Sequence, residues 1–480
     1  MSRSNYTQKT SNIQQKLFFI VFCMLVFINP FPLGSNRVWA WSFEAMVATG
    51  LLLVMVLCSL FSNQCISWHR LKKMRLELKL IALWLFINFL YLIPLPIPLL
   101  SFLSPNVASA YADLNQPYGF LSLDVYATLK TLMLSLYYFT LFILGVILVN
   151  SRWRIKFILS LLLLLGLFES IYGMYLVSIG QTGTLVQVTT VSSHNASGTF
   201  INKNHLVAFL SMTFIMGLSL RMIVARKIKD TTHLDFKIRA IRFISHPLRM
   251  LDVSLFIILA GIWNTHSRAG LASFILAMVF LIAFVFFSNK SKSVNYKKIL
   301  SVFALGIVLL IFVADDVNFL LNSLGQNTDD SLGHVMNSAQ GRVLAVNQVL
   351  EHYPSYWFSG VGPGAYQVFF VNHRMVEQTA FFDHAHNDYI EFLIEYGILS
   401  LSLLILLLVF LYKIFMFIFK TRSNFYKYLG ICVISSMIYM LLHGNMDFNA
   451  RIPANLVIII LVISVIYGRI VMSSIIKSDN

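Results

Sequence analysis

Charged residues are scarce in this chain. They make up 12% of its 480 residues, whereas hydrophobic residues make up 58% and the mean hydropathy is +0.75. Because a soluble globular chain carries about 25% charge, this composition excludes that class and predicts a protein that crosses the membrane several times. The net charge of +16 would suit nucleic acid only if the basic residues shared one face. They are dispersed between apolar runs, so we expect no nucleic-acid partner.

Cysteines are also few. The chain has four, Cys23, Cys58, Cys65 and Cys432. Three of them fall in apolar runs and Cys65 falls in a basic loop, which excludes the disulfide framework typical of small secreted domains. We expect free thiols with packing roles.

Long apolar runs dominate the sequence instead. A membrane-spanning helix needs about 20 mostly apolar residues, and twelve candidates are present. They lie at residues 16–33, 41–62, 79–99, 128–149, 157–179, 205–224, 251–266, 270–288, 299–314, 398–419, 428–445 and 454–472. No repeat of fixed period and no low-complexity linker is visible. The sequence therefore predicts an all-α polytopic membrane protein, with residues 1–480 forming a single integral membrane domain.

The basic residues predict the orientation of these spans. The N-terminus, the C-terminal tail and every second loop, such as "HRLKKMRLELK" and "KTRSNFYK", hold 26 of the 36 Lys and Arg residues. By the positive-inside rule these segments, including both termini, are cytoplasmic. On the outer side, residues 315–397 form the only segment large enough to fold outside the bilayer. We predict that this insertion, between the ninth and tenth spans, is a mostly helical loop that carries part of a functional site.

Three motifs stand out in the outer loop. "GRVLAVNQVLEHY" predicts a short amphipathic helix with Val343, Val346 and Leu350 on one side. "SGVGPGAY" predicts a turn rather than a phosphate-binding loop, because it neither follows a strand nor opens a helix with the required lysine. "HNDYIEFLIEYG" predicts a helix that starts near His386 and runs into the tenth span.

Basic residues on the outer side run against the charge bias and need a local reason. Arg268 in "NTHSRAGLASF" lies at the outer boundary between two spans, where burying a guanidinium costs about 3 kcal/mol. Lys203 opens the sixth span, and Arg342 lies in the outer loop. Taken singly, these residues could cap helices, meet lipid headgroups or lie in water. Taken together, they suggest a site for an anion in the plane of the lipid, such as a lipid-linked diphosphate, because arginine matches phosphate oxygens bidentately.

The stretch "FFDHAHNDYIEFLIEYGILS" concentrates ionisable residues in an apolar chain. On a helix starting near His386, this histidine tops an apolar stripe and faces the protein. Histidine is the side chain best suited to accept a proton near neutral pH, so His386 is a candidate general base. The alternatives are a histidine that caps the helix or binds a headgroup, and a metal site, which the spacing of His384 and His386 does not favour.

The remaining charges of this stretch are assigned less specific roles. We expect Glu391 and Glu395 to form the solvated side of the helix, with His384 and Asp388 as possible neighbours of His386. Around the last outer turn, "HGNMDFNARIPANL" contains Asp447 and Arg451. There the carboxylate could take part in function or could pair with Arg451 or Arg268 as structural support.

These motifs, in this order, resemble those of the bacterial O-antigen ligase and O-antigen polymerase superfamily. In that superfamily a histidine followed by Asn, Ser or Gln precedes a helix with a glycine about ten residues on, and here these are His386, Asn387 and Gly397. The elements "SRAG", "GTFINKNHLVAFL", "GVGPGAY" and "HGNMDFNARIPANL" are also similar. The likeness extends from about residue 180 onward.

The resemblance implies a glycosyltransferase of the inner membrane that works at the periplasmic face without a metal or other cofactor. Its donor would be a glycan on undecaprenyl diphosphate, and the glycan would move en bloc, with inversion, to an acceptor hydroxyl on a glycan or lipid-linked acceptor. Arg268 and Arg342, assisted by Lys203, would hold the diphosphate, and His386 would activate the acceptor. Membrane lipids, a flippase and a chain-length regulator are the further partners that it implies.

Two sequence features favour a polymerase within this superfamily. Ser400 stands where ligases often have a second glycine, and "PFPLGSNRVWAW" is similar to the start of exopolysaccharide-associated members. The alternatives are a ligase that transfers to lipid A-core and a protein O-oligosaccharyltransferase. A transporter of a lipid-linked sugar is the alternative from another class, although it should carry charges near the bilayer midplane. A non-catalytic assembly factor is a further alternative.

Overall fold

The computed structural model of the chain is an all-α polytopic membrane protein. It describes residues 3–61, 68–112, 114–183, 188–189, 195–225, 247–288, 346–347, 349–373 and 383–478. Within these residues, eight helices are long and apolar enough to cross a membrane. The predicted span at 299–314 and the first part of the predicted loop at 315–397 lie outside the described residues.

Eleven of the predicted spans overlap a helix of the structure. These helices are α1 (Arg3–Ile28), α2 (Val38–Phe61), α4 (Arg75–Leu90), α7 (Val125–Leu148), α8 (Arg152–Ser178), α9 (Lys203–Val224), α11 (Pro247–Asn264), α12 (Arg268–Ser288), α18 (Leu401–Lys420), α19 (Asn424–His443) and α20 (Pro453–Ser478). They form because a chain in lipid must pair its own backbone groups within each segment. Side-chain caps complete several helix starts, for example Asp124, which accepts from the backbone N–H of Ala127 at 2.9 Å.

Shorter elements connect the spans. The helices are α3 (Trp68–Lys72), α5 (Ile97–Leu103), α6 (Pro105–Ala112), α16 (Tyr366–His373), α17 (Asp388–Tyr396) and the 3-10 turns η1 (Leu33–Ser35), η2 (Tyr353–Tyr356), η3 (Gly397–Ser400) and η4 (Asn449–Arg451). Strand β1 (Leu95–Pro96) pairs antiparallel with β2 (Tyr118–Gly119), and β3 (Thr182–Gly183) pairs antiparallel with β4 (Val188–Thr189).

The third predicted span ends earlier than the prediction at 79–99. Helix α4 stops at Leu90, and the apolar residues that follow form β1 and α5. Pro94, Pro96 and Pro98 explain the difference, because proline lacks the N–H that a continuing helix needs.

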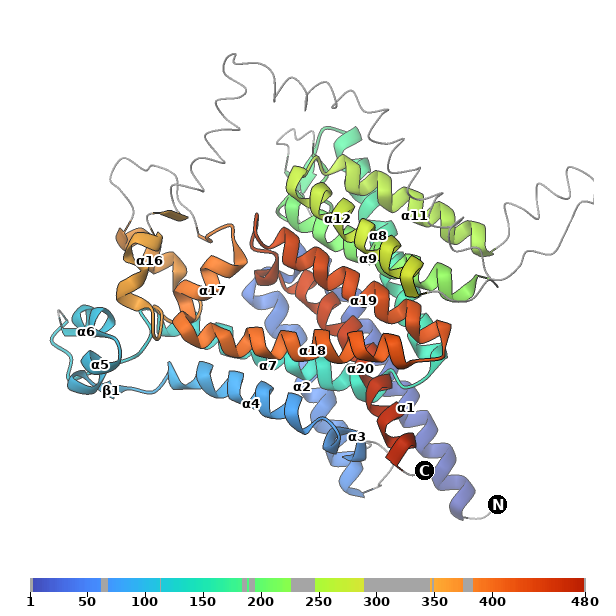
Figure 1. Cartoon of the computed structure of the whole chain (residues 1–480), viewed down its shortest axis with the longest axis horizontal. Coiled ribbons are helices and arrows are strands. Elements are labelled where there is room, and N and C mark those ends of the chain that lie inside the picture. Colours follow the sequence, from blue (N-terminus) through green and yellow to red (C-terminus); the bar gives the residue numbers. More distant parts are fainter. Residues whose placement is uncertain are drawn as a thin grey trace, which may run out of the picture.

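Helix α9 is the centre of the bundle. It packs against α8, α11, α12, α19 and α20, and every residue from His205 to Met222 is buried. The short elements α5, α6, α16 and α17 gather at one end of the molecule, and the N- and C-termini lie together at the other end (Figure 1). The first residues of α9 and α12 are therefore fixed in place by the surrounding helices.

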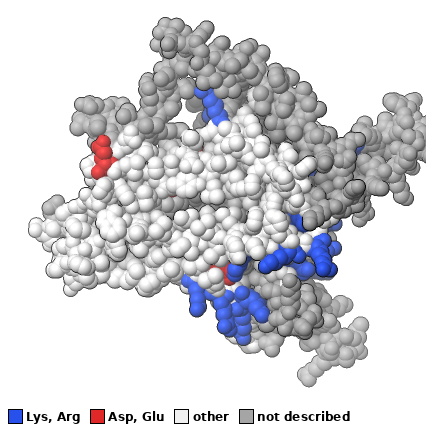
Figure 2. Space-filling view, in the orientation of Figure 1, with Lys and Arg blue, Asp and Glu red and all other residues white. Residues whose placement is uncertain are grey.

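Lys and Arg also gather at one end. Figure 2 shows most of them on this face near the end that carries the termini. The exposed basic residues Lys72, Lys73, Arg75, Arg152 and Lys420 lie at the junctions of α3 with α4, α7 with α8, and at the end of α18. This distribution matches the grouping of basic loops in the sequence.

Part of the outer loop is described. Residues 346–347 and 349–352 are helical, in agreement with the helix predicted there, and "SGVGPGAY" is a turn as predicted. This turn contacts the end of α17, where the backbone N–H of Val361 donates to the carbonyl of Ile394 at 2.9 Å. Cys23 and Cys432 are free thiols, as expected, and Cys65 lies outside the described residues.

Candidate active site

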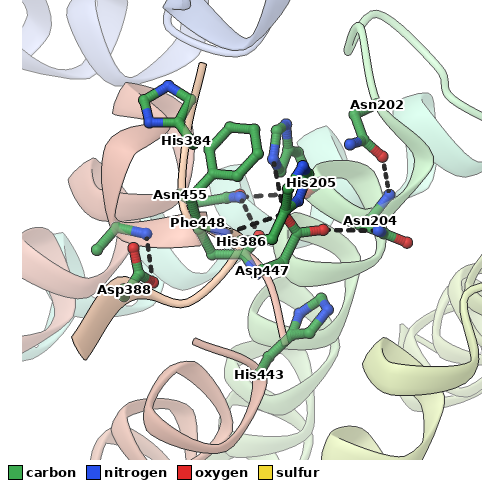
Figure 3. Close-up of polar contacts among 12 residues, drawn as sticks. Asn202, Asn204, His205, His384, His386, Asp388, His443, Asp447, Phe448 and Asn455 are labelled. Atoms are coloured by element: carbon green, nitrogen blue, oxygen red, sulfur yellow. Dashed lines mark hydrogen bonds and ion pairs between the residues drawn. The ribbon is translucent and has the colours of Figure 1, made fainter. Parts of the chain in front are cut away.

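Four segments that are distant in sequence meet at one site. They are the starts of α9 and α12, residues 383–388 before and at the start of α17, and the loop 444–452 between α19 and α20 (Figure 3). The site therefore brings together predicted candidates from "GTFINKNHLVAFL", "SRAG", "DHAHND" and "HGNMDFNARIPANL".

His386 lies just before α17 and not within it. The helix starts at Asp388, and Asn387 caps it by accepting from the N–H groups of Tyr389 and Ile390 at 3.1 and 3.2 Å. His386 itself has a φ of +49°, a left-handed conformation that turns its side chain away from the helix axis. The prediction of a helix starting near His386 thus placed the start two residues early. Asparagine is strongly preferred at the N-cap position, so the helix begins after Asn387. The predicted inward orientation holds, since the side chain is 14% exposed.

Asp447 fixes the tautomer of His386. The Nδ1 of His386 lies 3.2 Å from Oδ1 of Asp447. Because an ionised carboxylate only accepts, Nδ1 carries the proton and the neutral ring has its lone pair on Nε2. Burial alone would raise the pKa of the fully buried Asp447, but the imidazoles of His205 and His386 hold that pKa well below its usual range. His386 is therefore oriented as a proton acceptor by a buried anion.

Hydrogen bonds connect Asp447 to the starts of two helices. Its Oδ2 accepts from Nδ2 of Asn204 at 2.6 Å, and Oδ1 of Asn204 accepts from the hydroxyl of Ser267 at 2.7 Å. Ser267 also caps α12, where its hydroxyl accepts from the N–H of Gly270 at 3.3 Å. This chain of contacts leads from His386 to the residues next to Lys203 and Arg268.

Lys203 and Arg268 lie together at this end of the bundle. Each opens a helix, Lys203 in α9 and Arg268 in α12, and their charges interact. The ammonium of Lys203 donates to the backbone carbonyl of His266 at 3.3 Å, while Arg268 is exposed. Two cations and two helix N-termini, which carry partial positive charge, make this end suited to an anion. Arg342, the third predicted cation, lies outside the described residues.

Arg451 is held by carboxylates of α17 and does not pair with Asp447. It lies 3.1 Å from Oε1 of Glu391 and 2.6 Å from Oε2 of Glu395, and its guanidinium lies 4.3 Å from the ring centre of Phe392. Both glutamates are 1% exposed, so the prediction that they are solvated is wrong. The reason is that an arginine about sixty residues away supplies the charge that permits their burial.

His384 joins the same buried network. Its Nδ1 lies 2.8 Å from Oε1 of Glu391. Burial opposes protonation of this ring, but the carboxylate of Glu391 raises the pKa of His384 above its usual value. His384 and His386 thus face different partners, Glu391 and Asp447. Within the described residues, no three His, Cys, Asp or Glu side chains are grouped in a way that could hold a metal ion.

Asp388 and Asn387 fasten the start of α17 to the loop 444–452. The backbone N–H of Asp388 donates to the carbonyl of Gly444 at 2.8 Å, and its carboxylate accepts from the N–H of Ala450 at 3.1 Å. The side chain of Asn387 donates to the carbonyl of Asn445 at 3.0 Å. Both residues support the geometry around His386.

Four residues of the site were not singled out from the sequence: Asn204, His205, Ser267 and Phe448. The ring of Phe448 contacts three imidazoles, those of His384, His386 and His205, with ring centres 4.1, 5.0 and 4.7 Å apart. The pair Asn204–His205 at the start of an apolar span was a usable signal, because polar residues at such positions are candidates for function.

Comparisons with known proteins agree with the motifs. The family model described as O-Antigen ligase matches residues 253–405, about a third of the chain. The match runs from α11 into α18 and includes Arg268, Arg342 and His386, whereas Lys203, Asp447 and Arg451 lie outside it. No curated protein matches the chain. The matched segment contains the histidine and arginine motifs of the site, and over these residues the chain is similar to the O-antigen ligase/polymerase superfamily.

Proposed function

We propose that this protein is a periplasmic-face glycosyltransferase. It transfers a glycan en bloc from undecaprenyl diphosphate to an acceptor hydroxyl during surface polysaccharide biosynthesis, and it acts as a polymerase whose acceptor is another lipid-linked repeat unit. The observation that carries the proposal is the contact chain from His386 through Asp447, Asn204 and Ser267 to the helix starts that bear Lys203 and Arg268. It couples a proton acceptor to an anion-binding end of the bundle.

The reaction needs three roles, and the residues present suit each of them. Nε2 of His386 accepts the proton of the acceptor hydroxyl as that oxygen attacks the anomeric carbon of the donor. The bond between the anomeric carbon and the diphosphate oxygen breaks, and undecaprenyl diphosphate leaves with the bonding electrons. Lys203, Arg268 and Arg342 stabilise the charge that develops on the leaving group. Attack opposite the leaving group inverts the anomeric centre.

The orientation in the membrane follows from the two ends of the molecule. Most of the Lys and Arg residues visible in Figure 2 gather near the end that carries the termini, and the site lies at the ends of α9, α12 and α19 that are remote from it. The positive-inside rule assigns the first end to the cytoplasm. A lipid-linked diphosphate in the outer leaflet then reaches the site from the plane of the bilayer.

The test is transfer by purified protein in the presence of EDTA. The donor is a lipid-diphosphate-linked oligosaccharide, and the parallel acceptors are a lipid-linked repeat unit, lipid A-core and a serine peptide. We expect transfer to the lipid-linked repeat unit, and a loss of about 10²–10⁴-fold in His386→Ala. His352→Ala, a change on the outer loop away from the site, serves as the control and should retain activity.

Each other outcome changes a specific part of the proposal. If His386→Ala transfers glycan as fast as the wild type, the base assignment is wrong. Transfer to lipid A-core alone would make the protein a ligase, and transfer to serine a protein oligosaccharyltransferase. Loss of wild-type activity in EDTA would require a metal.

A further inference from the structure

Asp447 is a buried anion that needs a partner of opposite charge. Its side chain has no exposure to solvent, and a carboxylate in that position is costly unless a positive charge compensates it. The bonds from Asn204 and from the backbone N–H of Phe448 satisfy its oxygens but bring no charge. The compensating charge must come from a titratable or basic neighbour.

Two imidazoles compete for this role at the same oxygen. Nδ1 of His386 lies 3.2 Å from Oδ1 of Asp447, and Nε2 of His205 lies 3.8 Å from that atom. Figure 3 shows both rings beside Asp447 and Phe448. His205 is the more buried of the two, with 4% of its side chain exposed against 14% for His386. Among the described residues, Nε2 of His205 has no hydrogen-bond partner, so the carboxylate is the group that its proton faces.

The proposed reaction decides which imidazole carries the charge. A general base must be neutral before it accepts a proton, so His386 cannot be the resting cation. Arg451 is held by Glu391 and Glu395, and Lys203 donates to a backbone carbonyl. We propose that His205 is the imidazolium that balances Asp447, so that His386 stays neutral and ready to accept the proton of the acceptor hydroxyl. This inference rests on the proposed function, in which His386 is the base.

The surroundings of the His205–Asp447–His386 group are consistent with this role. Nδ1 of His443 is bonded to the hydroxyl of Tyr439 at 3.0 Å, and a carboxylate oxygen of Asp388 accepts from Ala450. The titratable and charged side chains near this end of the elements packed around the group include Lys203 on α9, Arg268 on α12, His384 before α17, Asp388, Glu391 and Glu395 on α17, Tyr439 and His443 on α19, and Arg451 on η4.

The first experiment is the dependence of the transfer rate on pH for wild type and His205→Gln. Glutamine keeps a polar side chain but cannot carry the charge. Without the charge of His205, the uncompensated carboxylate of Asp447 favours protonation of His386. The acid limb of the profile, where the transfer rate falls because His386 is protonated, should therefore move to higher pH by about one unit. At alkaline pH the rate of the variant should approach that of the wild type, with the donor KM unchanged. His443→Gln, a change of another buried histidine, should leave the profile in place.

A purely structural role of His205 predicts a different pH profile for His205→Gln. If His205 only packs the site, His205→Gln will lower the rate by the same factor at all pH values and leave the acid limb where it is, which overturns the proposal. If His205→Gln does not fold, NMR of ¹⁵N-labelled histidine in the wild type decides the question, with variants of the neighbouring histidines used only to assign the signals. The proposal requires protons on both nitrogens of His205 at pH values where His386 is neutral, with the signal assigned to His205 by elimination against His384→Gln, His386→Ala and His443→Gln. Two neutral rings would refute it.

The same measurements separate this inference from the proposed function. If the wild type transfers no glycan to any acceptor, the proposed function fails, and the NMR result still reports the charge of His205. If the wild type transfers glycan and His386→Ala does not, but the acid limb of His205→Gln is unmoved, only the role of His205 is wrong.

Discussion

At the scale of single residues, the site depends on one arginine shared by two carboxylates. Arg451 connects the loop 444–452 to α17 through Glu391 and Glu395. Those carboxylates stabilise the charged guanidinium and raise the pKa of Arg451 further above its usual value, against the effect of burial. The position of Asp447, four residues earlier, follows from this attachment.

Replacing Arg451 should therefore destabilise the protein. Arg451→Met leaves the buried Glu395 without its cation and Glu391 with His384 alone, and we expect a loss of about 3–5 kcal/mol in the free energy of unfolding. Denaturant titration of the detergent-solubilised protein measures it. Arg451→Lys should lose less, because one ammonium can pair with one carboxylate but lacks the planar fork that reaches both. An Arg451→Met protein as stable as wild type would contradict the role of this network.

At the scale of elements, the break between α17 and α18 is the feature that hydropathy did not predict. The sequence predicted one helix running into the tenth span, whereas the structure has α17, then η3, then α18. Gly397 causes the break with φ +55° and ψ −139°, a conformation that is essentially restricted to glycine. A Cβ there would lie 2.5 Å from the carbonyl oxygen of Trp357.

Gly397→Ala should accordingly strain the backbone at residue 397 and crowd the new methyl group against the carbonyl oxygen of Trp357. We expect a loss of about 1–3 kcal/mol from the backbone conformation alone, together with lower transfer activity, because α17 carries the residues that support His386. Ser400→Ala is the matched control three residues later, where the hydroxyl bonds only to the carbonyl of Gly397 at 2.8 Å. The measurement is denaturation and transfer rate of both variants. Equal losses in the two would show that the glycine is not needed for its backbone.

The sequence predicted the elements better than their contacts. Hydropathy located the spans because their length and apolar character are local properties. It could not show that Glu391 and Glu395 are buried, since their partner Arg451 is distant in sequence and joins them only after the helices pack. For the same reason His386 and Asp447 were each singled out, but the contact between them was not predicted. His205 was overlooked beside Lys203, although both lie in the same short motif.

At the scale of the whole molecule, the two ends should lie on opposite sides of the membrane. In a variant whose four native cysteines are serine, a membrane-impermeant thiol reagent added to spheroplasts should label Met446→Cys, which is exposed beside the site. It should not label Lys73→Cys, in the turn between α3 and α4, until the membrane is broken. Labelling of both, or of Lys73→Cys alone, would contradict the orientation.

The burial of α9 also has a consequence for how the protein is made. Every residue of this helix from His205 to Met222 is buried. Two of the helices that cover it, α19 and α20, come near the end of the chain. At about 5–20 residues per second, the ribosome reaches α20 roughly 10–45 seconds after it finishes α9. During that interval the helix that carries Lys203, Asn204 and His205 must rest in the bilayer with its polar end uncovered. The end of the molecule that carries the candidate site is therefore among the last parts to be assembled.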